Sequence, residues 1–324
     1  MRILLVSPRG FCAGVRRAVD ALHVAIDRFP PPIYVFNEIV HNRHVVAEFA
    51  DRVRFVRDID TVPAGATLMI SAHGASPDVR QRAIRRGIQL LDATCPLVTR
   101  LHNDARRLAA DGYHLLLIGH RGHDEVVGVV GEAPEAITVV QSSDEADAVV
   151  VPHPQRVAWI TQTTLSVETV REMVERLRRR FPTMIGPQDG TAHAATGHLC
   201  YATQNRQEAI RRFTPQSERV VVVGSPNSSN SRRLAEIAAD TGVPSLRIDD
   251  ASELDPAWFF TEPGGTGASG VPVGTILLTA GASAPKRLVQ ECVAWFVDHF
   301  GATVELAVHR EETTRFPLPK ELRN

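Results

Sequence analysis

Residues 8–15 read Pro-Arg-Gly-Phe-Cys-Ala-Gly-Val, and the rest of the chain can be interpreted outward from this stretch. It follows a short apolar run, residues 3–6, that is typical of a buried strand. After it, apolar residues recur at helical spacing from Val15 to Ile26. The pattern therefore predicts that Cys12 lies in a glycine-flanked turn at the carboxyl end of a strand, where open α/β sheets bind ligands.

Two more cysteines occupy comparable positions in the sequence. Cys95 lies in Asp-Ala-Thr-Cys-Pro, after the apolar run 88–91, and Cys200 lies just before a polar helix start. We expect the chain to fold so that the three cysteine loops meet. Cys292 differs, because it shares an amphipathic helix face with apolar residues and is predicted to belong to the core.

Length and composition limit the class of protein. A chain of 324 residues is expected to form two or three domains, and 44% apolar with 23% charged residues is typical of a soluble globular protein. A formal net charge of −1 argues against nucleic acid or an anionic membrane as the main partner. The sequence shows neither a membrane span nor a signal-peptide pattern, so a cytoplasmic location without disulfides is expected.

Strand and helix patterns alternate along almost the whole chain. This order predicts the α/β class with parallel strands, in three units of about a hundred residues each. The predicted domains are 1–95, 96–196 and 197–284, followed by a helix, strand and tail over 285–324. Two stretches rich in glycine, proline, threonine and alanine, 186–197 and 262–274, are predicted to be surface insertions.

The loops after the predicted strands carry small hydroxyl, amide and imidazole side chains. Such groups near helix N-termini suit an anionic phosphate. The chain has neither a Walker lysine loop nor a dinucleotide glycine fingerprint, so the predicted phosphate site lacks a nucleotide-binding signature. Taken singly, each of these residues would more often be a helix cap or a turn residue. The set comprises His41, His73, His123, Thr163, Ser228, Ser229, Asn230 and Ser283, with Glu125 as a nearby acid.

Three loop cysteines without a fourth suggest an iron–sulfur cluster, or a zinc ion with one open position. A metal atom that lacks one protein ligand can bind a substrate directly as a Lewis acid. Two other classes remain open on the residues alone. One is a zinc hydrolase with Glu125 as its base, and the other is a cluster protein that senses iron or oxygen without catalysis.

As a set, the motifs resemble the hydroxymethylbutenyl diphosphate reductase family, and they cover nearly the whole chain in order. Besides residues 8–15, the N-terminal matches are Val-His-Asn-Arg at 40–43, Ser-Ala-His-Gly at 71–74 and Asp-Ala-Thr-Cys-Pro-Leu-Val at 92–98. The central matches are Gly-His with His123 and Glu125 at 119–125, and Thr-Gln-Thr-Thr-Leu-Ser at 161–166. The last are Cys-Tyr-Ala-Thr at 200–203, Asn-Ser-Ser-Asn-Ser at 227–231 and Thr-Ala-Gly-Ala-Ser-Ala-Pro at 279–285.

The resemblance implies a trefoil of three pseudo-symmetric α/β domains around a central 4Fe–4S cluster. Cys12, Cys95 and Cys200 would hold three irons, and the fourth iron would bind the allylic hydroxyl of the substrate. Glu125 and Thr163 would deliver protons. The diphosphate pocket of the family matches His41, His73, His123, Ser228, Ser229, Asn230 and Ser283, with Thr163 also near the substrate.

The implied activity is the reductive dehydroxylation of 4-hydroxy-3-methylbut-2-enyl diphosphate to isopentenyl and dimethylallyl diphosphate. This is the last step of the methylerythritol phosphate route to isoprenoids, and reduced ferredoxin or flavodoxin supplies the electrons in the family. One departure from the family pattern is the insertion at 191–198, which could offer His198 as an extra ligand close to Cys200.

Overall fold

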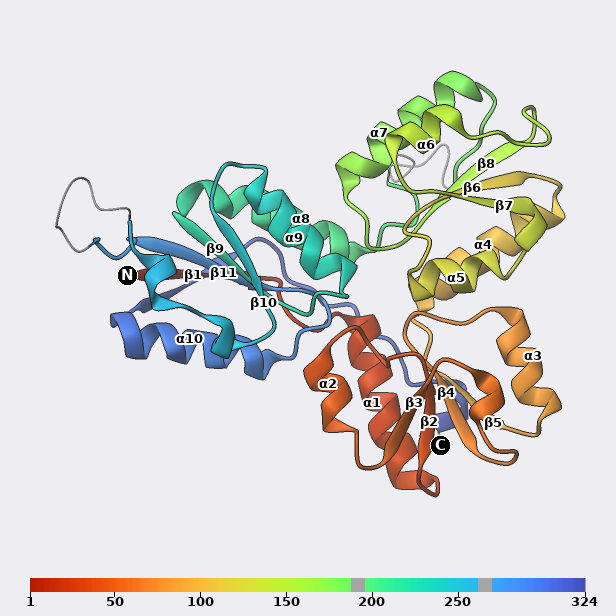
Figure 1. The fold of residues 1–324 in the computed structure, drawn as a ribbon, viewed down its shortest axis with the longest axis horizontal. Coiled ribbons are helices and arrows are strands. Elements are labelled where there is room, and N and C mark those ends of the chain that lie inside the picture. The colour runs from red at the N-terminus through yellow and green to blue at the C-terminus, as the bar shows by residue number, and fades with distance from the viewer. Residues whose placement is uncertain (188–195, 262–269, 324) are drawn as a thin grey trace. The chain divides into compact units, whose positions relative to one another are not determined.

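The computed structural model describes residues 1–187, 196–261 and 270–323 (Figure 1). Both predicted insertions lie for the most part outside the described residues. The described chain alternates strands and helices, which confirms the predicted α/β class. Among the described residues, no helix combines the length and apolar character needed to cross a membrane.

The strands of the described residues form three sheets, and every strand pair in them is parallel. The five-stranded sheet has the order β10-β9-β11-β1-β12, the four-stranded sheet β3-β2-β4-β5, and the three-stranded sheet β7-β6-β8. The strands are β1 (Arg2–Ser7), β2 (Ile33–Phe36), β3 (Val53–Val56), β4 (Thr67–Ile70), β5 (Gln89–Asp92), β6 (His114–Ile118), β7 (Ile137–Val140), β8 (Val157–Thr161), β9 (Arg219–Val223), β10 (Ser245–Ile248), β11 (Thr275–Ala280) and β12 (Thr303–Val308).

Helices follow most of the strands, as parallel sheets require of their connections. They are α1 (Ala13–Arg28), α2 (Arg43–Glu48), α3 (Pro77–Arg85), α4 (Pro96–Ala110), α5 (Asp124–Val130), α6 (Ser143–Ala148), α7 (Val167–Arg180), α8 (Tyr201–Phe213), α9 (Ser229–Ala239) and α10 (Lys286–Phe300). Ser166 caps α7 as predicted, because its side chain accepts the backbone N–H of Thr169.

By contacts, the chain divides into two compact units. The first unit comprises Met1–Cys12, His41–Arg43 and Tyr201–Thr314, and the second comprises Ala13–Val40, His44–Cys200 and Arg315–Asn324. The five-stranded sheet belongs to the first unit, and the other two sheets belong to the second. β1 pairs with β11 and β12, which lie far from it in sequence, rather than with β2.

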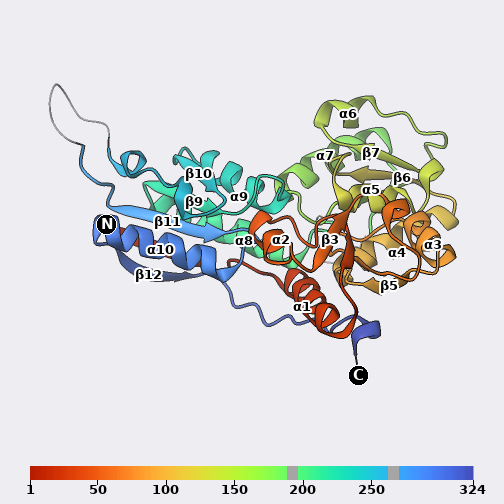
Figure 2. The ribbon, with the colours of Figure 1, turned by 60° about the horizontal axis from the view of Figure 1, so that its bottom comes forward.

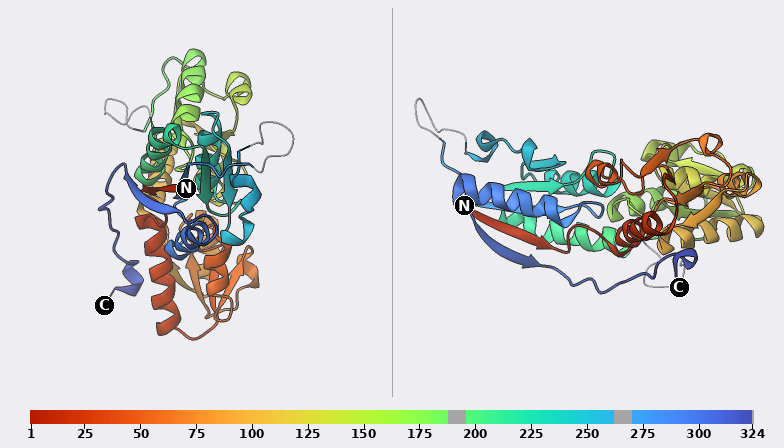
Figure 3. Two further views of the ribbon diagram at one scale, coloured as in Figure 1. Left: turned by 90° about the vertical axis from the view of Figure 1, so that its left-hand side faces the viewer. Right: turned by 90° about the horizontal axis from the view of Figure 1, so that it is seen from below.

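Apolar side chains on both faces bury the central strands of the five-stranded sheet. Ile3 packs with α10 on one face, while Leu4 packs with α8 and α9 on the other. The ribbon of these helices and of the sheet between them is drawn in Figure 3. The three-stranded sheet is covered in the same way, by α6 and α7 on one face and by α4 and α5 on the other (Figure 2). The loops at the carboxyl ends of these strands are thereby held on rigid supports.

Candidate functional site

Cys12 lies in the turn between β1 and α1, as its sequence context predicts. Its backbone N–H donates to the carbonyl of Ala282 over 3.2 Å, and the N–H of Gly10 donates to Ala280 over 3.3 Å. Gly10 has a φ of 68°, and a Cβ at this position would lie only 3.1 Å from the carbonyl oxygen of Ala284. Glycine is therefore needed for this turn to lie against the loop that follows β11.

A buried arginine that the sequence analysis missed also supports the Cys12 turn. Arg206 on α8 is 1% exposed, and its guanidinium donates to the carbonyl of Gly10 over 2.7 Å. It also donates to the carboxylate of Glu312, at 3.0 Å from Oε1. Arg206 thus connects α8, the Cys12 turn and the chain after β12. Sequence patterns gave little indication of this role, because Arg206 and Glu312 are 106 residues apart in sequence.

The predicted serine and asparagine residues gather at the start of α9 in the first unit. Ser228 caps α9, with its Oγ accepting the N–H of Ser231 over 3.3 Å, and Ser229 is buried in the first turn. Asn230 is 4% exposed, and its Oδ1 accepts the N–H of Ala282 over 3.0 Å. Its Nδ2 is buried and has no hydrogen-bond partner among the described residues.

Ser283 connects this group to His41. Its Oγ donates to the carbonyl of His41 over 2.9 Å and lies 3.4 Å from Oγ of Ser228. The segment that carries His41 is anchored by Arg43, whose backbone N–H donates to Oγ of Ser225. The guanidinium of Arg43 also forms ion pairs with three acidic side chains of the same unit, Asp249, Asp250 and Glu253.

Glu125 is buried in the second unit and is held by Thr163. The backbone N–H of Thr163 donates to Oε1 over 2.6 Å, and the Thr163 hydroxyl donates to Oε2 over 2.8 Å. Glu125 as a whole is only 2% exposed. Glu125 lies in the first turn of α5, but the N-cap of this helix is His123. The Glu125 carboxylate therefore contacts the segment after β8 and does not cap α5.

Two of the predicted histidines lie next to each other in the same unit. The rings of His73 and His123 have centroids 5.9 Å apart and are nearly perpendicular, at 87°. Nδ1 of His123 accepts the backbone N–H of Glu125 over 3.2 Å, so in the neutral ring the proton is on Nε2. In that tautomer the ring can donate from Nε2 while Nδ1 caps α5.

The other two loop cysteines are fixed through their backbones. The N–H of Cys95 donates to Ala72 over 3.0 Å, next to His73, and the N–H of Cys200 donates to Thr163 over 3.1 Å. Cys95 is the N-cap of α4, Cys12 directly precedes α1, and Cys200 directly precedes α8. All three thiols therefore lie at helix N-termini, where the helix dipole stabilises a thiolate or another anion.

His198, which the sequence left as a possible extra ligand, is directed to an acidic residue. Its Nε2 lies 3.1 Å from Oδ2 of Asp104 on α4. Burial is the main effect that lowers the pKa of His198, and the hydrogen bond from His198 is the main effect that lowers the pKa of Asp104. The nitrogen that would bind a metal most readily is thus engaged with a carboxylate.

Cys292 belongs to the core, as predicted. It is fully buried on α10 among apolar side chains, and this burial raises its pKa to about 12. Such a thiol is not a metal ligand or a nucleophile near neutral pH. None of the four cysteines, all of which lie in the described part of the chain, forms a disulfide.

The chain is similar over most of its length to one protein family. The family model described as LytB protein matches residues 3–296. A protein of Acidothermus cellulolyticus named 4-hydroxy-3-methylbut-2-enyl diphosphate reductase is 48% identical, over 99% of this chain and 90% of that protein. A protein of the same name from Rhodopirellula baltica is 45% identical, over 100% and 96%.

Solved structures give the same result for the fold. The E-1-hydroxy-2-methyl-but-2-enyl-4-diphosphate reductase of Plasmodium falciparum matches with a TM-score of 0.89 at 32% identity, covering 99% of this chain and 96% of that chain. A structure of (E)-4-hydroxy-3-methyl-but-2-enyl diphosphate reductase, described as the terminal enzyme of the non-mevalonate pathway, matches with a TM-score of 0.62 at 26% identity. It covers 92% of this chain and 100% of that chain.

Proposed function

The chain belongs to the LytB family of 4-hydroxy-3-methylbut-2-enyl diphosphate reductases, and we propose that the two sets of residues described above form its active site. It is an oxidoreductase of isoprenoid biosynthesis. The reaction replaces the allylic hydroxyl of the substrate with hydrogen. It consumes two electrons and two protons, releases water, and yields isopentenyl or dimethylallyl diphosphate.

The proposal is supported above all by the similar local structure around each of the three loop cysteines. Each directly precedes a helix, each is partly exposed, and each has its backbone N–H fixed by a carbonyl of a neighbouring loop. Helix N-termini favour the negative charge that thiolate ligands bring to a metal centre. We propose that Cys12, Cys95 and Cys200 hold a 4Fe–4S cluster, which supplies single electrons and an open iron for the substrate hydroxyl.

The diphosphate is bound by uncharged donors and histidines. In the first unit, support comes from the N-terminus of α9, from Ser228, Ser229 and Ser283, and above all from the buried Nδ2 of Asn230, which has no partner among the described residues. A phosphate oxygen would satisfy that amide and benefit from the helix dipole. His41, His73 and His123 complete the proposed set, and in its neutral tautomer His123 carries its N–H on Nε2.

Proton delivery is assigned to Glu125, with Thr163 as its partner. A hydroxide is a poor leaving group, so the departing oxygen must receive a proton. The Thr163 hydroxyl donates to Oε2 when the carboxylate is ionised. When the carboxyl is protonated, the hydroxyl can turn to accept a hydrogen bond from it, and the hydrogen of the hydroxyl can then be donated towards the substrate. The backbone N–H of Thr163 keeps the carboxyl in place in both states.

The proposal also includes the electron donor and the location predicted from the sequence. Reduced ferredoxin or flavodoxin would supply the electrons, and the reaction would take place in the cytoplasm. The three α/β domains with boundaries near residues 95, 196 and 284 remain part of the same proposal.

The test begins with protein purified without oxygen. We expect brown protein with about four irons per chain, and turnover of the substrate with a chemical reductant. Replacing Cys12, Cys95 or Cys200 by serine should remove or cripple the cluster, while Cys292→Ser should leave the iron content unchanged. Colourless protein containing zinc would indicate the hydrolase class instead, and a cluster without turnover would indicate a sensor.

A further inference from the structure

His102 lies on α4, two turns after Cys95, and neither the motifs nor the proposed mechanism assign it a role. It is 6% exposed and packs between the loop that carries His73 and the helix that carries Glu125. We propose that His102 is a positioning residue that sets α5, and with it Glu125, against the His73 loop. This inference rests on the proposed function, because it deepens the role assigned to Glu125.

The His73 loop approaches the ring of His102 through a glycine. Gly74 follows His73 directly and has a φ of 82°. A Cβ at Gly74 would lie 3.0 Å from Nε2 of His102 and 3.3 Å from Cγ2 of Thr94. Both distances are shorter than ordinary van der Waals contact, so a side chain at position 74 would collide with its neighbours. With glycine there, the loop backbone can pack directly against the imidazole ring.

Helix α5 approaches the same ring through a second glycine. A Cβ at Gly128 would lie 3.3 Å from Cε1 of His102 and 3.5 Å from Nε2. Gly128 is three residues after Glu125, so the two lie about one turn apart on the same side of α5. A shift of the helix at Gly128 would therefore carry the Glu125 carboxylate away from Thr163.

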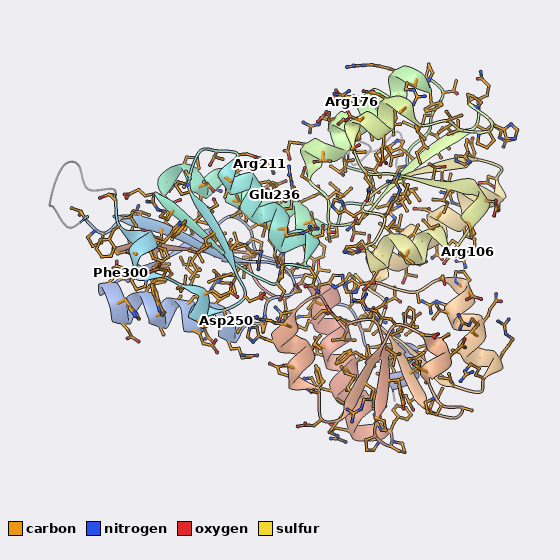
Figure 4. All side chains as sticks on the ribbon, in the orientation of Figure 1. Arg106, Arg176, Arg211, Glu236, Asp250 and Phe300 are labelled. Atoms are coloured by element: carbon orange, nitrogen blue, oxygen red, sulfur yellow. The ribbon has the colours of Figure 1, made fainter. Side chains whose placement is uncertain are left out.

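One strong hydrogen bond fixes the orientation of the ring. Nδ1 of His102 lies 2.7 Å from Oε1 of Glu132, which follows α5 and has a side chain only 6% exposed. The Nδ1–H group donates to the carboxylate, so that the Nε2 edge is turned to the two glycines. Arg106, labelled in Figure 4, adds a longer ion pair of 3.7 Å to the other oxygen of Glu132.

His102 is not proposed to take part in the reaction directly. Nε2 is buried and has no hydrogen-bond partner among the described residues, while the ring lies against Gly74 and Gly128 and is hydrogen-bonded to Glu132. His102 thus contacts the residues adjacent to the proposed site rather than the site residues. Its effect on turnover would pass through the position of α5.

The test uses His102→Asn in the cluster-loaded protein. The asparagine amide can still donate to Glu132 from the place of Nδ1, while the space of Cε1 and Nε2 is vacated. We expect iron content and visible spectrum to be unchanged and kcat to fall about tenfold, on the scale of a misplaced catalytic group. As a single substitution, Gly128→Ala should reduce kcat. Combined with His102→Asn, it should restore part of the lost kcat, because the new methyl group fills the vacated space.

A double-mutant cycle with Glu125→Gln distinguishes positioning from a general structural effect. If His102 acts through Glu125, His102→Asn should cost less than about twofold once the acid is gone. Equal losses in both backgrounds would overturn the proposal. His114→Asn is the control, since His114 is a half-buried, hydrogen-bonded histidine at the amino end of β6, and it should leave kcat unchanged.

Hydrogen exchange separates failure of this inference from failure of the proposed function. The amides of residues 124–130 should exchange faster in His102→Asn than in the wild type, and this measurement needs no substrate. If the wild type has no reductase activity, the proposed function fails while the exchange rates still test the position of α5. Unchanged exchange in His102→Asn would overturn the role of His102.

Discussion

Oδ2 of Asp104 lies 3.1 Å from Nε2 of His198, and this contact joins segments 94 residues apart in sequence. Asp104 is on α4, the helix capped by Cys95, and His198 is two residues before Cys200. The backbone N–H of His198 also donates to Oγ1 of Thr161 at the end of β8. Two of the three proposed cluster ligands are thereby connected through one hydrogen-bonded pair within the second unit.

We expect His198→Ala to weaken the segment that carries Cys200. Loss of the bond to Asp104 should lower the free energy of unfolding by about 1–3 kcal/mol, as for other hydrogen bonds to charged groups. The variant should also release iron to a chelator faster than the wild type. Asp111→Asn, at the exposed C-cap of α4, is the control. Equal release rates for both variants and the wild type would show that the pair does not hold Cys200.

The sequence predicted the strands that are apolar runs well, and it missed three short edge strands. β4, β6, β8, β9 and β11 lie where nearly continuous apolar runs predicted them, because strands covered on both faces carry few polar side chains. β3, β7 and β10 were not predicted. Each has four residues, lies at a sheet edge and mixes polar with apolar side chains, so no run marks it.

For the site, the sequence could indicate residues but not the groups that support them. Glu125 and Thr163 were predicted together through motifs, and two hydrogen bonds join them in the structure. Arg206 could not be found in the same way, because its partners Gly10 and Glu312 come from distant segments. The contact of His102 with two glycines depends on backbone packing, which has no signature in a single sequence.

We predict that the ion pair of Arg206 with Glu312 is essential to the first unit. Glu312→Gln removes the countercharge of a guanidinium that is 1% exposed. Breaking such a buried pair from one side should cost about 3 kcal/mol or more, measured by denaturant unfolding. Arg206→Met with Glu312→Met should be less damaging than Glu312→Gln alone, since it leaves no buried charge. A neutral effect of Glu312→Gln would contradict this expectation.

His114 should make the protein less stable at mildly acidic pH. Burial is the main effect that lowers its pKa below 6.5, and nearby His153 adds to it. Below pH 6.5 the unfolded chain binds this proton more readily than the folded chain, so the contribution of His114 to stability is full above that value and is lost as the pH falls through the folded pKa. The unfolding midpoint of His114→Gln should fall less than that of the wild type between about pH 7.5 and 5.5. Parallel midpoint curves would exclude a role for His114.

The proposed diphosphate site predicts binding without magnesium. Asn230→Ala removes the buried Nδ2 donor, and it should weaken the binding of a non-reactive diphosphate by about 1–3 kcal/mol in calorimetry. Ser228→Ala should weaken it similarly and also uncap α9. Ser142→Ala removes a comparable cap, from α6, and serves as the control because it should destabilise the fold without changing diphosphate affinity. An absolute requirement for magnesium would argue for a different anion site.

Proton delivery by Glu125 gives a prediction that separates binding from chemistry. Glutamine keeps the size of the side chain and can still accept the N–H of Thr163, but it has no acidic proton to give. Glu125→Gln should therefore retain its cluster and bind the substrate, while turnover falls at least about a hundredfold, the scale of a missing general acid. Glu135→Gln, an exposed acid after α5, is the control and should leave turnover unchanged.

Three measurements are needed on the Glu125→Gln protein: iron per chain, substrate affinity and kcat with a chemical reductant. The expected pattern is normal iron, near-normal affinity and a large loss of kcat across the whole pH range. If the loss appears in affinity instead, Glu125 and Thr163 orient the substrate rather than protonate it. Near-normal turnover with full cluster content would assign Glu125 to stabilising the end of β8, and the proton would have to come from another group close to the leaving oxygen.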